Sequence, residues 1–302
     1  MSTFLTTSVT PLVIIAGIVL GFLLPAVGLL WKNYIGLLLV VLMLFLYLRI
    51  DTEDVKNSVR DPKPLGWALL MTFVFMPLLA LIGRVFFAPI LFSGIVLALS
   101  SPPAAATGFW TRIFKGNIAF ALVATAISSL FAVVTVPASM LLATGAIASF
   151  DPYPMILMLA ELILVPAVTV LLLKKAVHIE WGRVTRHTAH LELVVVFLLI
   201  WGSIAPGIES VRENLLQFGL LNVFMFASLG LGFSIAFLVG KKFGYAHAIS
   251  AGIATCVKNA GLSLVIGLTM FGSSVVPPLI ANLVAQNLLI VLLLCFKSKL
   301  AK

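Results

Sequence analysis

Charged residues are scarce in this chain of 302 residues. They make up 10% of it, the hydrophobic set makes up 62%, and the mean hydropathy is +1.22. Soluble domains carry about 25% charged residues, so the composition excludes a soluble globular fold. The two cysteines, Cys256 and Cys295, lie in apolar stretches, and no disulfide framework is expected from them. The N-terminus has no basic segment ahead of its apolar stretch, which argues against a cleaved signal peptide.

Patterns that carry out chemistry are missing as well. The sequence shows no nucleophile–base pair, no cluster of metal ligands and no glycine-rich phosphate loop. An intramembrane enzyme is therefore disfavoured. We expect neither a metal centre nor a cofactor.

Long apolar segments are what the chain does have. About 20 apolar residues cross a bilayer as one helix. Segments of this kind cover residues 9–30, 34–50, 65–87, 89–114, 117–142, 153–173, 188–207, 215–240, 246–272 and 277–296. We predict an all-α polytopic membrane protein of ten transmembrane helices, with a single transmembrane domain over residues 1–302 and the lipid bilayer as its partner.

Lysine and arginine are unevenly distributed between the two ends of these segments. The face that holds both termini carries 15 of them, and the other face carries 3, namely Lys32, Arg84 and Arg212. Such a bias marks the cytoplasmic face. We therefore expect both termini in the cytoplasm and a bacterial inner or plasma membrane as the location. The net charge of +9 then reflects topology, and no nucleic-acid partner is expected.

The segments form two halves of five, and a weak internal repeat relates them. The two halves are residues 9–142 and 153–296. Because five is odd, the second half starts from the opposite face, so the repeat would be inverted. A shift of 158 residues places Gly94 on Gly252 and Ser100–Pro103 on Lys258–Gly261. Each run breaks a helix in the fourth segment of its half. We predict that helices 4 and 9 are both broken, which is the best sequence indication of a secondary transporter's binding site.

Lys258 stands at the centre of the uncharged stretch from Ala246 to Gly272. A charge there costs roughly 3 kcal/mol on insertion scales and is a functional-site hypothesis by default. The competing interpretation is a structural lysine that locks two helices together. Glu161, the only acid well inside a segment, either partners a polar group or carries protons. Lys258 and Glu161 are the candidate proton carriers.

Other polar residues in the apolar segments have simpler interpretations. Hydroxyls there mostly bond to carbonyls of their own helix, which applies to Thr107, Thr111, Thr125, Ser128 and Ser129. Amides of the last segment are expected to bridge helices rather than bind substrate, namely Asn282, Gln286 and Asn287. Pro102 and Pro103 precede small residues, which suggests a helix restart with the prolines near its first turn.

Several of these runs resemble motifs of the bile acid:sodium symporter family. Phe73–Ala80 is similar to its third-span motif. Ser101–Gly108, followed by Lys115–Ala119, is similar to its Cys/Ala-Pro-Gly-Gly-Thr-Ala-Ser-Asn and Arg/Lys-Gly-Asn-Val-Ala pattern. Val257–Leu262 resembles Met-Gln-Asn-Ser-Gly-Leu. The resemblance implies a core domain over residues 65–142 and 215–296, in which the broken helices 4 and 9 cross. It also implies a panel domain over residues 9–50 and 153–207. Substrate would bind in the crevice between the two domains.

The departures from the family fall on its two sodium sites. One site uses a Ser–Asn pair, a fifth-span Ser and Thr and a ninth-span Glu, and the resembling positions here are Thr107, Gly108, Ala121, Thr125 and Ala254. The other site shares that Glu and adds a ninth-span Gln and a third-span Gln. The resembling positions here are Ala254, Lys258 and Thr72, in that order. Charges about 4 Å apart repel by roughly 4 kcal/mol at an effective dielectric near 20. The second site is therefore expected to hold no sodium while Lys258 is protonated.

The sequence thus predicts a secondary transporter of a small organic anion, bile acid-like or another carboxylate, without the usual sodium coupling. We expect the crossing and the substrate site to comprise Ser101, Pro102, Pro103, Thr107, Gly108, Lys258, Asn259 and Gly261. Lys258 would neutralise the site or meet the substrate carboxylate, and Asn259 would hold the crossing together. Proton coupling and uniport are both open. So are a cation/proton antiporter, a metalloid exporter that uses Cys256, and a channel.

Overall fold

A computed structural model describes residues 2–144, 150–177 and 188–300, together with residues 179, 181, 184 and 185. Among these residues every regular element is a helix, and one isolated β-bridge is present. The predicted all-α class is confirmed. In chain order the helices are α1 (Ser2–Leu23), α2 (Pro25–Gly28), η1 (Leu29–Tyr34), α3 (Ile35–Leu48), α4 (Thr52–Arg60), α5 (Pro62–Leu70), η2 (Met71–Phe75), α6 (Met76–Ile82), η3 (Gly83–Val85), α7 (Pro89–Ser100), α8 (Thr107–Ile113), α9 (Ile118–Thr144), α10 (Pro152–Leu159), η4 (Ala160–Leu164), α11 (Val165–Ala176), α13 (Ala189–Ile204), η5 (Ala205–Gly207), α14 (Ile208–Glu213), α15 (Leu215–Gly240), η6 (Lys241–Phe243), α16 (Tyr245–Cys256), α17 (Ala260–Phe271), η7 (Ser273–Val275), α18 (Val276–Cys295) and α19 (Lys297–Leu300).

Seven helices in the described part of the chain are long and apolar enough to cross a membrane. They coincide with seven of the predicted apolar segments. The other three segments hold shorter apolar helices, which are Leu12–Leu23, Pro89–Ser100 and Ala260–Phe271. Two of those three are the segments predicted to break. The chain is an integral, multi-pass membrane protein.

Two of the long helices widen into a π-turn just ahead of a proline. The π-turn η2 precedes Pro77, and η4 precedes Pro166. Proline has no N–H, so a carbonyl one turn earlier loses its usual partner and the helix adjusts locally. Thr72 lies in η2 and is fully buried. Glu161 lies in η4 and is exposed.

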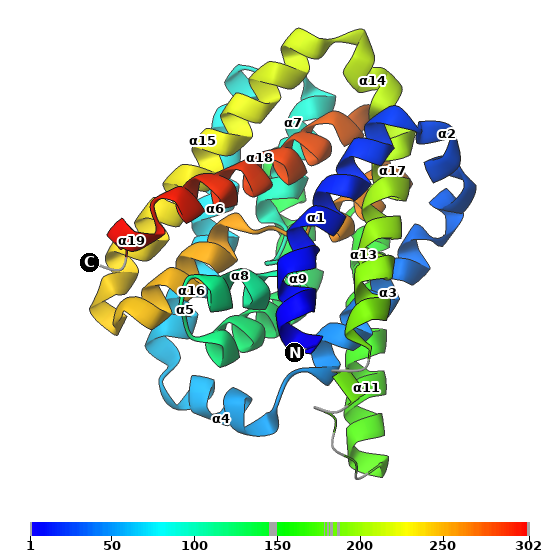
Figure 1. Cartoon of the computed structure of the whole chain (residues 1–302). Coiled ribbons are helices and arrows are strands. Elements are labelled where there is room, and N and C mark those ends of the chain that lie inside the picture. The colour runs from blue at the N-terminus through cyan, green and yellow to red at the C-terminus, as the bar shows by residue number, and fades with distance from the viewer. Residues whose placement is uncertain are drawn as a thin grey trace.

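We name two sets of helices after the panel and core domains that the resemblance implies (Figure 1). The panel group consists of α1, α3, α11 and α13, where α13 packs on α1 and α3 and α11 packs on α3. The core group consists of α5 to α9 and α15 to α18, where α15 packs on α16 and α18, and α7 packs on α6, α9 and α18. In Figure 1 the panel group lies toward the right, and α15, α16 and α18 lie toward the left.

Two glycines allow close helix packing inside the core group. A Cβ on Gly94 of α7 would lie 2.4 Å from Pro278 Cγ and 2.7 Å from the carbonyl oxygen of Val275. A Cβ on Gly252 of α16 would lie 2.9 Å from Phe233 Cε2. These are the two positions that the shift of 158 residues places on each other. Each is a point where only the absence of a side chain permits the contact.

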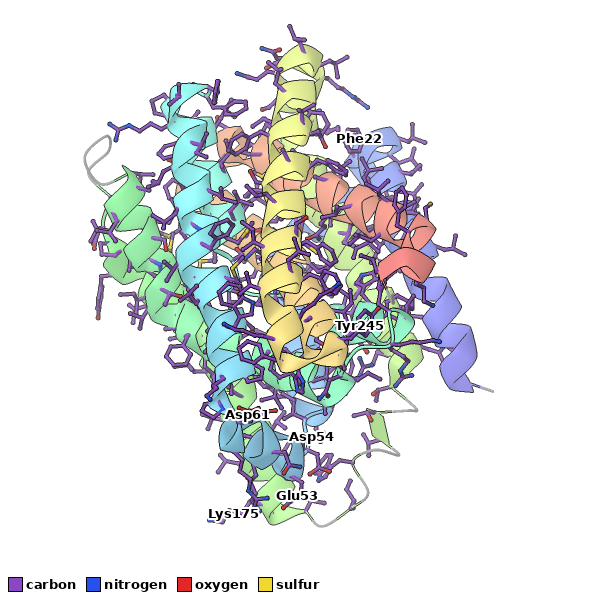
Figure 2. The ribbon with its side chains drawn as sticks, turned by 90° about the vertical axis from the view of Figure 1, so that its left-hand side faces the viewer. Phe22, Glu53, Asp54, Asp61, Lys175 and Tyr245 are labelled. Atoms are coloured by element: carbon purple, nitrogen blue, oxygen red, sulfur yellow. The ribbon has the colours of Figure 1, made fainter. Side chains whose placement is uncertain are left out.

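Charged side chains gather at one end of the molecule. Figure 2 shows Glu53, Asp54, Asp61 and Lys175 at its lower end, whereas Phe22 lies near the opposite end. At the charged end Arg49 pairs with Glu192. Here too Lys174 Nζ donates to the carbonyl oxygens of Tyr47 at 3.1 Å and Ile50 at 2.7 Å. These contacts tie together the ends of α3, α11 and α13.

Candidate functional site

The two broken segments meet in a short antiparallel backbone pairing. The isolated bridge joins Pro103 to Lys258. The amide of Ala104 donates to the carbonyl oxygen of Val257 at 2.9 Å, and the amide of Asn259 donates to that of Pro102 at 2.8 Å. Backbone freed at membrane depth must find partners inside the protein. Each break therefore supplies hydrogen-bond partners for the other.

The first break follows from the proline pair. Ser101 precedes Pro102 and is extended, with a ψ of 146°, because a residue before proline avoids the helical region. The next helix, α8, begins only at Thr107. The expectation that the prolines lie in the first turn of the restarted helix is wrong. They lie in an extended link instead, because that link pairs with the second break.

The second break is set by Asn259. Helix α16 ends at Cys256 and α17 begins at Ala260. The Asn259 side-chain oxygen accepts the amide of Leu262 at 3.1 Å and so caps α17. Its side-chain nitrogen is buried and has no hydrogen-bond partner among the described residues. The backbone amide of Asn259 also joins the two breaks through its bond to the Pro102 carbonyl oxygen.

Lys258 lies at the middle of this link and is fully buried. No described residue offers its Nζ a hydrogen bond. A buried cation is ordinarily paired or hydrogen-bonded. The Lys258 ammonium therefore has the capacity to bind an anion or an acceptor that the described residues do not supply.

A cavity of about 90 Å³ opens beside Lys258. Its walls come from the panel helices α1, α3 and α13 and from the core helices α8, α17 and α18 together with both links. The residues that line it are Ile14, Leu39, Leu42, Met43, Ala104, Ala105, Ala106, Trp110, Val196, Leu199, Ile200, Val257, Lys258, Asn259, Ala260, Gly261, Leu264, Leu283, Gln286, Asn287 and Ile290. Lys258 is the one ionisable group among these described residues, and the remaining wall is chiefly apolar.

Three of the predicted site residues line the cavity, and five do not. Lys258, Asn259 and Gly261 form part of its wall. The others lie outside the lining, namely Ser101, Pro102, Pro103, Thr107 and Gly108. The first break contributes Ala104 to Ala106 and Trp110 in their place. The sequence gave no sign that Ala104 to Ala106 line a cavity. Their place in its wall depends on how far the link runs before α8 begins.

The positions that correspond to the family's sodium sites are buried on helices that pack together. The turn η2 and the helices α9 and α16 contact one another. The buried positions on or beside them are Thr72, Thr107, Gly108, Ala121, Thr125, Ala254 and Lys258. In the described structure the hydroxyls of Thr72 and Thr107 have no hydrogen-bond partner. Thr125 Oγ1 donates to the Ala121 carbonyl oxygen at 2.8 Å.

Glu161 and Glu192 are both distant from the cavity wall. Glu161 is exposed on η4 and does not line the cavity. The two candidate proton carriers are thus not brought together. Glu192 is engaged by Arg49 at the charged end. Cys256 is fully buried, and its Sγ lies 3.6 Å from the Ile253 carbonyl oxygen. The metalloid-exporter alternative would require the Cys256 thiol to line the cavity, and it does not.

The last helix contributes residues that the sequence placed only as helix bridges. Gln286 Oε1 accepts the backbone amide of Lys258 at 2.8 Å, so the bridging prediction is confirmed for Gln286. Asn287 Nδ2 donates to Leu283 of its own helix at 2.7 Å. Neither side-chain atom of Asn282 has a hydrogen-bond partner in the described part of the chain. Gln286 and Asn287 both line the cavity, which the sequence did not indicate.

The turn Lys115-Gly116-Asn117 fixes the start of α9 against α16. Lys115 has a φ of 58°, and a Cβ on Gly116 would lie 2.7 Å from Ser250 Oγ. The amide of Asn117 donates to Ser250 Oγ at 2.9 Å, and its side-chain oxygen accepts the amide of Phe120 at 3.0 Å. This motif therefore positions the helices around the crossing and does not enter the cavity.

Comparison with known proteins gives one consistent answer. The model of the sodium bile acid symporter family matches residues 36–214. The chain is 28% identical over 292 residues to the "Uncharacterized sodium-dependent transporter YocS" of Bacillus subtilis (strain 168), covering 94% of this chain and 89% of the relative. It is 24% identical to the "Uncharacterized protein YbaS" of the same organism, covering 78% and 79%. It is 23% identical to the "Probable sodium/metabolite cotransporter BASS1, chloroplastic" of Oryza sativa subsp. japonica, covering 76% and 57%.

Proposed function

The chain belongs to the sodium bile acid symporter family and is a membrane transporter, and we propose that it carries a small organic anion across the bilayer by alternating access. The observation that carries this proposal is the fully buried Lys258, which is the one ionisable residue in an otherwise apolar cavity wall and whose ammonium has no partner among the described residues. A carboxylate is the complementary group, because a charge-assisted hydrogen bond to it satisfies the ammonium.

The rest of the cavity fits an anion with an apolar body. Its wall is mostly aliphatic, and Asn259 adds a second buried donor without a partner in the described chain. Cavities of this kind take a ligand through apolar contact and orient it with a few polar groups. The Lys258 ammonium would hold the carboxylate, and the aliphatic wall would accept the remainder of the substrate.

We infer that the transport cycle does not use sodium in the way the family's name describes. Ala254 stands where a carboxylate would attract the cation, and Lys258 adds a positive charge at the same place. Electrostatic repulsion of the size given above corresponds to about a thousandfold loss of sodium affinity. The ammonium takes the place of the cation and bears its charge. A proton on Lys258 is then the natural candidate for coupling, and uniport is the alternative.

The proposed movement is that of the core group against the panel group. Support comes from the cavity, because both groups supply its wall. Substrate bound there would be reached from one side or the other as the groups shift. The ten-helix inverted repeat belongs to this proposal, and so does the orientation with both termini in the cytoplasm, which the 15 to 3 distribution of basic residues supports.

A ligand screen tests the proposal directly. Purified protein would be unfolded thermally with acetate, butanoate, benzoate or cholate, each in sodium chloride and in choline chloride. We expect at least one carboxylate to raise the melting temperature equally in both salts, since bound ligand stabilises the folded state. Stabilisation by carboxylates only in sodium would contradict the loss of the sodium sites. Stabilisation by none of them would contradict the choice of substrate class.

A further inference from the structure

We propose that Gln286 is a positioning residue, which fixes the Lys258 link to α18 and so determines how Lys258 is placed at the cavity wall. The inference rests on the proposed function, because it assigns the residue that places the anion-binding group. Gln286 belongs to α18, whereas Lys258 belongs to the link between α16 and α17. They are joined by the 2.8 Å bond from the Lys258 amide to Gln286 Oε1.

The link is held from two sides. On one side, residues of the first break donate a hydrogen bond to the Val257 carbonyl oxygen and accept one from the Asn259 amide. The amide of Lys258 is not used there, because Lys258 and Pro103 form a non-hydrogen-bonded pair and the bridge makes its bonds at the neighbouring residues. Gln286 takes up this remaining amide from the other side. The crossing alone would leave a buried donor without a partner, which is costly.

Burial makes this bond decisive for the ammonium. Gln286 is 6% exposed and Lys258 is fully buried, so water cannot readily replace the side-chain oxygen. The Lys258 Nζ has no hydrogen-bond partner among the described residues that could hold it in place. Its position therefore depends on the packing around the side chain and on the backbone from which the side chain extends. A bond that fixes this backbone fixes the point from which the ammonium is held.

Asn287 offers a matched control on the same helix. It also lines the cavity, but its Nδ2 donates to the Leu283 carbonyl oxygen within α18 instead of bonding to the link. Gln286→Met keeps the side-chain length and removes the acceptor, and Gln286→Glu keeps an acceptor oxygen. Asn287→Leu removes a cavity amide without touching the Lys258 amide.

Hydrogen exchange tests the bond without any substrate. We expect the amides of residues 257–260 to exchange at least about tenfold faster in Gln286→Met, because a lost hydrogen bond lowers local protection. Gln286→Glu and Asn287→Leu should exchange as the wild type does. Unchanged exchange in Gln286→Met, or equal acceleration in Asn287→Leu, would overturn the proposal.

A double-mutant cycle tests the effect on the ammonium. The ligand is whichever of acetate, butanoate, benzoate and cholate stabilises the wild type most. We expect Gln286→Met to raise the Kd of this ligand about tenfold when Lys258 is present. In the Lys258→Gln background the same change should raise the Kd less than about twofold, since the effects of coupled residues are not additive. Asn287→Leu should act equally in both backgrounds. An equal effect of Gln286→Met in both backgrounds would make Gln286 merely structural. If the wild type binds none of the four, the proposed function fails, while the exchange experiment still decides whether Gln286 fixes the link.

Discussion

The Lys258 side chain is the residue on which transport chemistry depends. It is fully buried, and the described residues give its ammonium neither an acid nor a hydrogen-bond acceptor. A structural lysine that locks two helices would need such a partner on a neighbouring helix. The structure instead gives it the wall of a cavity. An anion that enters the cavity would complete the pairing, whereas a sodium ion would be repelled.

Replacing this ammonium should weaken anion binding and flatten its pH dependence. A hydrogen bond to a charged group contributes about 1.5–3 kcal/mol, so Lys258→Gln should raise the Kd of a bound carboxylate roughly 10- to 100-fold. In the wild type, affinity should fall as pH rises, because the ammonium loses its proton. In Lys258→Gln it should stay constant. Calorimetric titration across pH measures both effects, and an unchanged Kd and pH profile in the variant would make Lys258 structural.

Restoring the missing carboxylate should restore a response to sodium. Ala254 is a buried residue of α16, four positions before Lys258 in the sequence. We expect Ala254→Glu combined with Lys258→Gln to be stabilised by sodium chloride relative to choline chloride, because an acid is added and the ammonium is removed. Lys258→Gln alone is the control and should not respond. A double variant indifferent to sodium would show that the site has lost more than its charge.

The broken helices depend on close backbone contacts at the scale of single elements. Gly94 lets α7 approach the start of α18, where a Cβ would lie 2.4 Å from Pro278 Cγ. Gly94→Ala should therefore lower the free energy of unfolding by about 1–3 kcal/mol, the usual cost of overpacking. Gly66 of α5 has no atom within 4 Å of a Cβ built on it. Gly66→Ala should be neutral or stabilising by roughly 0.5–1 kcal/mol. Thermal unfolding in detergent compares the two, and equal effects would contradict the packing.

The sequence predicted these elements as far as local chemistry determines them. Apolar length located the helices, and the proline pair and Asn259 located both breaks to within a few residues. What it could not predict depends on partners far along the chain. Helix α8 starts at Thr107 because the link before it pairs with residues more than 150 positions away. Gln286 joins the site through a single bond across 28 residues. Glu161 faces outward, which no count of apolar residues reveals.

At the scale of the whole molecule, alternating access requires the core group and the panel group to separate at the cavity. A Cβ on Gly261 would lie 2.5 Å from Leu199 Cδ2, so the two groups touch there. In a background without Cys256 and Cys295, a disulfide between Leu199→Cys and Gly261→Cys should abolish uptake, and reduction should restore it.

A second cysteine pair controls for the crosslink itself. A Cβ on Gly21 would lie 2.9 Å from Ile204 Cβ, and both residues belong to the panel group and lie outside the cavity lining. Crosslinked Gly21→Cys and Ile204→Cys should leave uptake intact, because no relative movement is blocked. Full transport by the crosslinked Leu199–Gly261 pair would contradict movement between the two groups.

The exchange of a sodium-binding carboxylate for a buried ammonium is tested most directly by uptake into proteoliposomes. The wild-type protein would be supplied with the carboxylate that stabilises it most, once under an inward sodium gradient and once with choline in place of sodium. If the Lys258 ammonium occupies the place where the cation would bind, the initial rates of uptake should be equal in the two conditions. Uptake that requires sodium would contradict it.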